Sequence, residues 1–234
     1  MKKNSCYLRP NKFSDPEKDF SEKELLQILG KKDKDLTTHD FMCIFQTILH
    51  AGTYEECVYF FPIGIKFFEA KKDIDVLDSL IEWALENEIR LREDKIWQEL
   101  ESCLLEELRA SFSDFSLEKT SGGIYPKNYD LISLLAEKSI KNRQIDQIFS
   151  PVFKQFVRPP FSYGSACWFF IFLKDFYYVQ LKTDLQNDCG FLSMLRSWGD
   201  DDELQKSAEN LILTNAGCNW ELEYWVDVLY RCGR

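Results

Sequence analysis

The segment SYGSACWFFIFLKDFYYVQL, residues 162–181, is the feature that most constrains what this chain can fold into. Eight consecutive apolar residues, Ala166 to Leu173, leave no side of the segment polar. The run is far shorter than the about 20 residues that cross a bilayer, and Lys174 with Asp175 ends it. Wound as a helix, the segment has apolar side chains on both faces. We therefore expect a central core helix enclosed by other helices, and no membrane span.

Helix start signals recur along the rest of the chain. Ser21 with Glu24, and Thr53 with Glu56, have the spacing of capping boxes, in which each side chain binds the other residue's backbone amide. A threonine cap also opens TTHDFMCIFQTILHAG, which we expect to remain helical until Gly52. No convincing run of alternating strand residues is visible. These signals predict a chain of consecutive helices.

Prolines and glycines divide these helices. Pro62 predicts a kink, or two short helices that meet near Phe61, because proline lacks the amide donor of a helix interior. Pro151 predicts an interruption in the helix expected over residues 143–157. TSGGIYP, with paired glycines and a proline, predicts a loop near residues 118–127.

We therefore expect an all-α fold, in which one irregular helical bundle forms a single domain over residues 21–234. An irregular N-terminal arm, residues 1–20, precedes it, and a proline-rich connector lies near residues 158–160. Residues 77–87 and 131–142 align loosely, so solenoid-like stacking of helix pairs is an alternative arrangement.

The charge balance limits the kinds of partner. The 234 residues include 29 Lys and Arg against 39 Asp and Glu, a net charge of −10. Nucleic-acid binding relies on cationic side chains that replace phosphate counterions, and no basic stripe appears here. We expect no nucleic-acid partner and no membrane partner. A basic protein is the partner that this charge favours.

The eight cysteines are scattered and form no CxxC pair. Several lie within apolar helical patterns, as Cys103 and Cys167 do. We interpret them as reduced, mostly buried thiols of a cytoplasmic protein. The N-terminal sequence has no apolar stretch of the kind found in secretory signals, which agrees with that location.

A histidine and cysteine set is the main enzyme or metal hypothesis. Its members are His39, Asp40, Cys43, His50 and Cys57. On one helix, His39 and His50 would be separated by about 16 Å along the axis, too far for one zinc ion. Phosphate-binding, hydrolase and zinc-protease motifs are absent from the sequence. We expect no metal and no cofactor, and an enzyme that uses His39 or His50 is kept only as an alternative.

The acidic residues are most concentrated between Asp73 and Glu107. Twelve carboxylates and three cations give this run a net charge of −9. Like charges at i, i+4 spacing destabilise a helix slightly, so we interpret the run as a docking surface for a basic protein. The alternative is an ordinary solvated helix face. The predicted partner-binding residues are Asp75, Asp78, Glu82, Glu86, Glu93 and Asp94.

In size, acidity, aromatic richness and lack of catalytic motifs, the chain resembles the all-helical immunity proteins of bacterial toxin systems. The segment TYEECVYFFPIGIKFFEA also resembles an aromatic and proline pattern of small bacterial helical proteins. The resemblance implies a protein-binding inhibitor, monomeric or weakly dimeric, that neutralises a cognate basic toxin such as a nuclease. A helical-repeat scaffold or adaptor that binds a peptide or protein is the alternative function.

Overall fold

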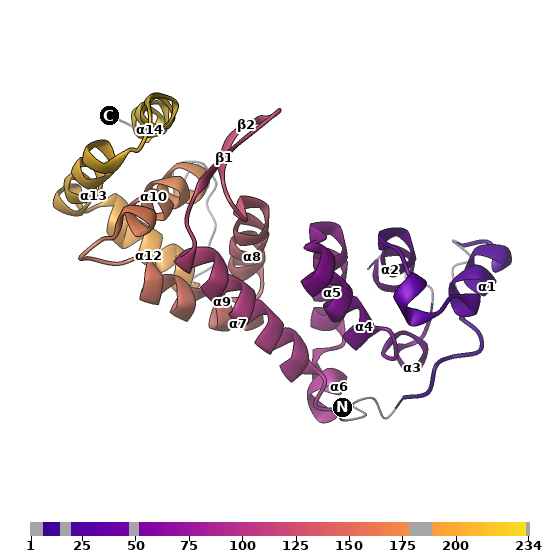
Figure 1. The fold of residues 1–234 in the computed structure, drawn as a ribbon. Coiled ribbons are helices and arrows are strands. Elements are labelled where there is room, and N and C mark those ends of the chain that lie inside the picture. Colours follow the sequence, from indigo (N-terminus) through magenta and orange to yellow (C-terminus); the bar gives the residue numbers. More distant parts are fainter. Residues whose placement is uncertain (1–6, 15–19, 47–51, 178–188, 233–234) are drawn as a thin grey trace. The chain divides into compact units, whose positions relative to one another are not determined.

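The computed structural model describes residues 7–14, 20–46, 52–177 and 189–232. Helices dominate these residues, which confirms the all-α prediction (Figure 1). The chain folds into two compact units, unit 1 over Met1–Cys103 and unit 2 over Leu104–Arg234. The boundary divides the domain expected over residues 21–234, and it falls inside the long helix α7, Trp97–Ser113.

Unit 1 contains six α-helices before α7 among its described residues. They are α1 (Glu22–Gly30), α2 (Thr38–Phe45), α3 (Tyr54–Cys57), α4 (Phe61–Lys71), α5 (Ile74–Glu86) and α6 (Glu88–Glu93), with a short 3-10 turn, η1, at Asp33–Asp35. Helix α5 packs against both α2 and α4. Buried Trp83 of α5 has Phe45, Phe61 and Tyr54 at ring-centroid distances of 5.2, 5.3 and 5.6 Å. This aromatic cluster forms the centre of unit 1.

Unit 2 adds, among its described residues, a hairpin and seven further helical segments. They are β1 (Leu117–Thr120), β2 (Gly123–Pro126), α8 (Tyr129–Lys141), α9 (Arg143–Phe156), α10 (Tyr163–Phe172), the π-helical turn η2 (Leu173–Tyr177), α12 (Gly190–Gly199), α13 (Asp202–Asn215) and α14 (Asn219–Arg231). Buried Phe153 lies near its centre, with Phe172, Phe191 and Trp198 at centroid distances of 4.5, 5.3 and 5.3 Å.

The apolar run that ends at Leu173 forms the core helix that the sequence predicts. Every residue of α10 from Ser165 to Phe172 is buried, as is Leu173 at the start of η2. Helix α10 packs against α13 and α14. In the part of the chain that the structure describes, no helix is long and apolar enough to cross a membrane.

The predicted caps of α1 and α2 are present, and Ser162 caps α10 in the same way. Ser21, Thr37 and Ser162 each accept a hydrogen bond from the backbone amide three residues later, at the starts of α1, α2 and α10. Near Phe61, α3 and α4 are separate helices with Pro62 in the first turn of α4, as expected. Helix α2 differs, because it ends at Phe45 instead of continuing to Gly52. Residues 47–51 lie outside the described part of the chain.

Two expectations for unit 2 are wrong. The predicted loop near residues 118–127 contains an antiparallel hairpin, in which Leu117 pairs with Pro126 and Thr120 with Gly123 (Figure 1). Its four-residue strands are too short to produce a visible alternation. The predicted break at Pro151 is also absent, because α9 continues from Arg143 to Phe156 with the exposed proline inside it. Its buried aromatic face, which includes Phe149 and Phe153, packs against neighbours and outweighs the lost hydrogen bond.

Candidate functional site

The six predicted partner-binding residues lie on two consecutive helices of unit 1. Asp75, Asp78, Glu82 and Glu86 are on α5, Glu93 is the last residue of α6, and Asp94 is its C-cap. Because α5 packs its Leu77, Leu80 and Ile81 side into the core, the carboxylates fall on its other faces. The structure therefore places all six on, or directly after, two helices that follow each other along the chain.

Their exposure is unequal. Asp75, Glu86, Glu93 and Asp94 are exposed, whereas Asp78 and Glu82 are half-buried. Asp75 and Glu86 are eleven residues apart, which places them on nearly the same face of α5 and about 16 Å apart along its axis. The exposed carboxylates are therefore spread along the helix surface and do not converge on one point.

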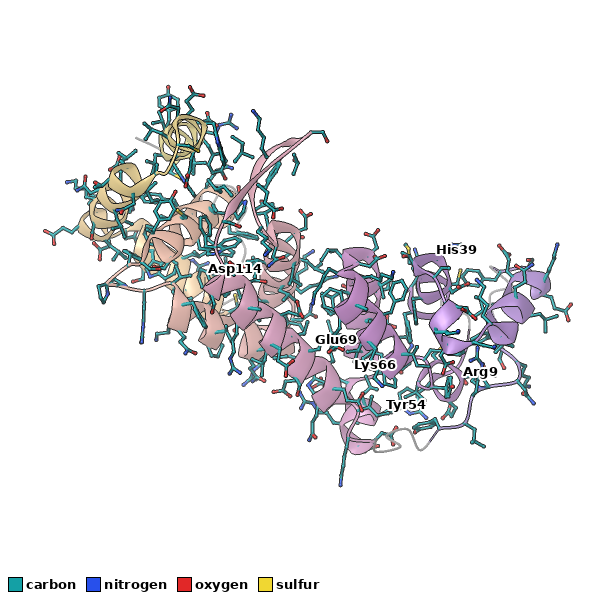
Figure 2. All side chains as sticks on the ribbon, viewed as in Figure 1. Arg9, His39, Tyr54, Lys66, Glu69 and Asp114 are labelled. Atoms are coloured by element: carbon teal, nitrogen blue, oxygen red, sulfur yellow. The ribbon has the colours of Figure 1, made fainter. Side chains whose placement is uncertain are left out.

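Asp94 has an internal structural role that the sequence did not indicate. Its Oδ2 accepts hydrogen bonds from the hydroxyls of Tyr7, at 2.6 Å, and Tyr54, at 2.5 Å. These hydrogen bonds lower the pKa of Asp94, and the same carboxylate raises the pKa of Tyr7. The contact connects the N-terminal arm to α3, near Tyr54 in Figure 2. Asp94 is therefore already engaged by two hydroxyls within unit 1.

Two cations in the acidic run are also engaged within unit 1. Arg90 forms an ion pair with Glu55, and its guanidinium carbon lies 3.8 Å from the centre of the Tyr54 ring. Arg92 Nε lies 2.6 Å from Glu88 Oε1, and its guanidinium carbon is 4.7 Å from the Trp97 ring centre. Both cations are therefore paired with residues that are not among the six predicted partner-binding residues.

Three of the six predicted carboxylates are therefore both exposed and without a hydrogen bond from a tyrosine hydroxyl: Asp75, Glu86 and Glu93. Within the described ranges, no ion pair joins Asp75, Glu86 or Glu93 to a cation. We call these three residues the acidic surface of unit 1. Such a surface generates a field that attracts cationic groups and speeds their association.

The histidine and cysteine set is only partly brought together. Cys43 Sγ lies 3.6 Å from His39 Nε2 on α2, and His39 is exposed at the surface (Figure 2). Burial raises the pKa of the Cys43 thiol to about 11, and the charges of Asp40 and Glu24 add to this effect. At neutral pH the thiol therefore stays protonated, which makes it a poor nucleophile.

The other members of the set lie elsewhere. Cys57 is buried, and its thiol donates to the backbone oxygen of Ile44 at 3.6 Å. His50 lies outside the described residues. Among the residues that are described, no three His, Cys, Asp or Glu side chains are placed to hold a metal ion together.

Asp40, a further member of the set, is a buried charge with hydrogen-bond partners inside unit 1. Its side chain is 4% exposed and accepts hydrogen bonds from Lys31 Nζ at 2.7 and 2.8 Å and from the backbone amide of Thr37 at 2.7 Å. Burial opposes ionisation, but the bonds from Lys31 and Thr37 outweigh it and lower the pKa of Asp40. The available sequence signal was its position three residues after the threonine cap of α2.

Comparisons with known proteins yield no relative: no protein-family model, curated protein or solved structure matches the chain.

Proposed function

We propose that this chain is a protein-binding inhibitor that recognises a basic partner through the acidic surface of unit 1. The observation that carries the proposal is that Asp75, Glu86 and Glu93 are exposed on consecutive helices while the neighbouring arginines pair with other residues. Cationic side chains of a partner would supply the missing counter-charges. Complementarity of this kind increases the association rate and selects among partners.

We further propose that the partner is a cognate toxin and that the chain acts as its immunity protein. The all-helical fold, the acidity and the aromatic core support this assignment. A basic toxin such as a nuclease needs its cationic surface to bind a polyanion, so an acidic helix seated on that surface would inhibit it by occlusion.

The first test compares capture of basic proteins by three forms of the chain. The triple variant D75K/E86K/E93K removes the acidic surface, and E118K/E137K/E223K makes the same charge change at exposed positions of unit 2. We expect wild type and the unit 2 variant to retain one common basic protein, and D75K/E86K/E93K to lose it. The expected fall in association rate is on the order of tenfold at low salt, because steering depends on the summed charge.

The proposed binding surface and the proposed immunity function can be contradicted separately. The surface is not the binding site if D75K/E86K/E93K retains the same proteins with the same salt dependence as wild type. For the immunity assignment, the captured protein is expressed with and without this chain. Growth arrest that wild type relieves, and D75K/E86K/E93K does not, is the expected result. A captured protein that is harmless by itself contradicts the toxin assignment and leaves the binding surface in place.

A further inference from the structure

A cavity of about 630 Å³ lies in unit 2 between α9 and α12. Its volume falls within the range of small-molecule binding sites. The two helices pack against each other, and each contributes residues to the wall of the cavity. Its lining combines cations, hydroxyls and apolar side chains.

The cations of this cavity are Lys154 and Arg158. Both are exposed, and within the described ranges neither forms an ion pair. An ammonium and a guanidinium group together offer several hydrogen-bond donors and no acceptor. On a chain with a net charge of −10, two such cations in one concave site favour an anion.

The facing helix adds donors and an apolar wall. Ser193 and Ser197 are one turn apart on α12, on the same side of that helix, and both line the cavity. Met194, Trp198 and the buried Val157 complete the lining with apolar surface. An anionic group that pairs with the cations would therefore have room for an attached apolar body.

Asp146 determines which end of the cavity can accept the anion. Its carboxylate accepts hydrogen bonds from the backbone amides of Gly190, at 2.9 Å, and Phe191, at 3.2 Å, and from the Ser150 hydroxyl. The first amides of α12 are therefore already used, and a negative charge stands at the end where Ser150 and Gly190 line the cavity. Repulsion at this end directs an anionic group towards Lys154 and Arg158.

We propose that this cavity binds a small organic anion, in which one carboxylate, phosphate or sulfonate group is attached to an apolar body. The charged group pairs with Lys154 and Arg158, and the apolar body lies against Met194 and Trp198. This site is independent of the acidic surface of unit 1, so either proposal can fail alone.

Two fluorescent probes test the proposal on the full chain. One is 8-anilinonaphthalene-1-sulfonate, and the other is N-phenyl-1-naphthylamine, which has the same aromatic body without the charge. We expect saturable binding of the sulfonate, weakened at least about tenfold in K154Q/R158Q, a change that corresponds to about 1.4 kcal/mol. Binding of the neutral probe should change less than about twofold, because its contacts are apolar.

A matched control and a blocking variant fix the location. K141Q/R143Q removes the same charge from exposed positions at the end of α8 and the start of α9, outside the cavity, and should leave sulfonate binding unchanged. Ser193→Trp fills the cavity from an exposed position and should weaken both probes. Circular dichroism verifies that each variant is folded.

Three results would overturn the proposal. The first is the absence of saturable sulfonate binding by wild type. The second is equal sulfonate affinity in wild type and K154Q/R158Q, or an equal loss in the K141Q/R143Q control. The third is unchanged binding of both probes in the folded Ser193→Trp variant.

Discussion

At the scale of single residues, the carboxylates of unit 1 have different roles. Asp40 is enclosed by Lys31 and Thr37, Asp94 accepts from two tyrosine hydroxyls, and Glu93 next to it is exposed without an ion pair among the described residues. Each role follows from which groups the fold brings within hydrogen-bond distance, and most of these groups come from another helix or loop.

Asp40→Asn is expected to destabilise unit 1 by about 2 kcal/mol at pH 7, because it leaves Lys31 without its counter-charge and weakens the cap of α2. The folded-state pKa of Asp40 is lowered, so its contribution is present above the unfolded pKa of about 3.9 and is lost as the pH falls through the folded value. Urea unfolding of wild type and variant at pH 7 and at about pH 3 measures this.

Asp35→Asn is the control, because Asp35 is an exposed carboxylate in the preceding turn. It should change the free energy of unfolding by less than about 0.5 kcal/mol. If Asp40→Asn destabilised the protein equally at both pH values, the ionised carboxylate would not be the source of the stability.

At the scale of the elements, the close packing of an aromatic side chain on α10 depends on one small residue. Gly164, the second residue of α10, lies against Phe115 from the segment after α7. Phe115 in turn has the rings of Tyr163, Trp168 and Trp225 as neighbours. The absence of a side chain at position 164 lets this aromatic group pack directly on the backbone of α10.

Gly164→Ala is expected to cost about 1–3 kcal/mol, because the new Cβ would lie 2.7 Å from the Phe115 Cβ, an atom close to the backbone that cannot easily move. Gly30→Ala is the matched control, since no atom lies within 4 Å of the added Cβ at the end of α1. It should be neutral or stabilise the protein by up to about 1 kcal/mol. Thermal unfolding of both variants tests the pair, and a Gly164→Ala protein as stable as wild type would contradict the close packing.

At the scale of the whole molecule, both units bury their cysteines. Of the seven described cysteines, none forms a disulfide, and Cys189 and Cys218 are the two that are not fully buried. Burial raises the pKa of the Cys232 thiol to about 12 and also raises the pKa values of Cys57 and Cys167. The prediction that the cysteines are mostly buried is thus confirmed for the described residues.

Native-state labelling measures this burial in both units at once. With a thiol-specific reagent at pH 8, Cys189 and Cys218 should react at least about tenfold faster than the buried cysteines, because reaction requires an accessible thiolate. Peptide mass spectrometry assigns each label, and urea should make all sites reactive. Labelling of Cys57 and Cys167 as fast as Cys218 in the native protein would contradict the burial described for units 1 and 2.

The sequence by itself determined most of the local structure. Capping residues such as Ser21 and Thr53, and the apolar run at Ala166–Leu173, predicted where helices begin and which one is central, because caps and periodic burial act within a few residues of the chain. It missed the hairpin near residues 118–127 and the continuity of α9 through Pro151, since short strands and an exposed proline give weak or misleading local signals.

The candidate functional residues could be identified only with the tertiary structure. The acidic run was visible in the sequence, but only packing separated the half-buried Asp78 and Glu82 from the exposed Glu86, and only the hydrogen bonds from Tyr7 and Tyr54 engaged Asp94. The cavity between α9 and α12 had no sequence signal, because Lys154 and Ser193 come from segments far apart in the chain. Burial and charge pairing are set by neighbours in space, which a linear pattern does not specify.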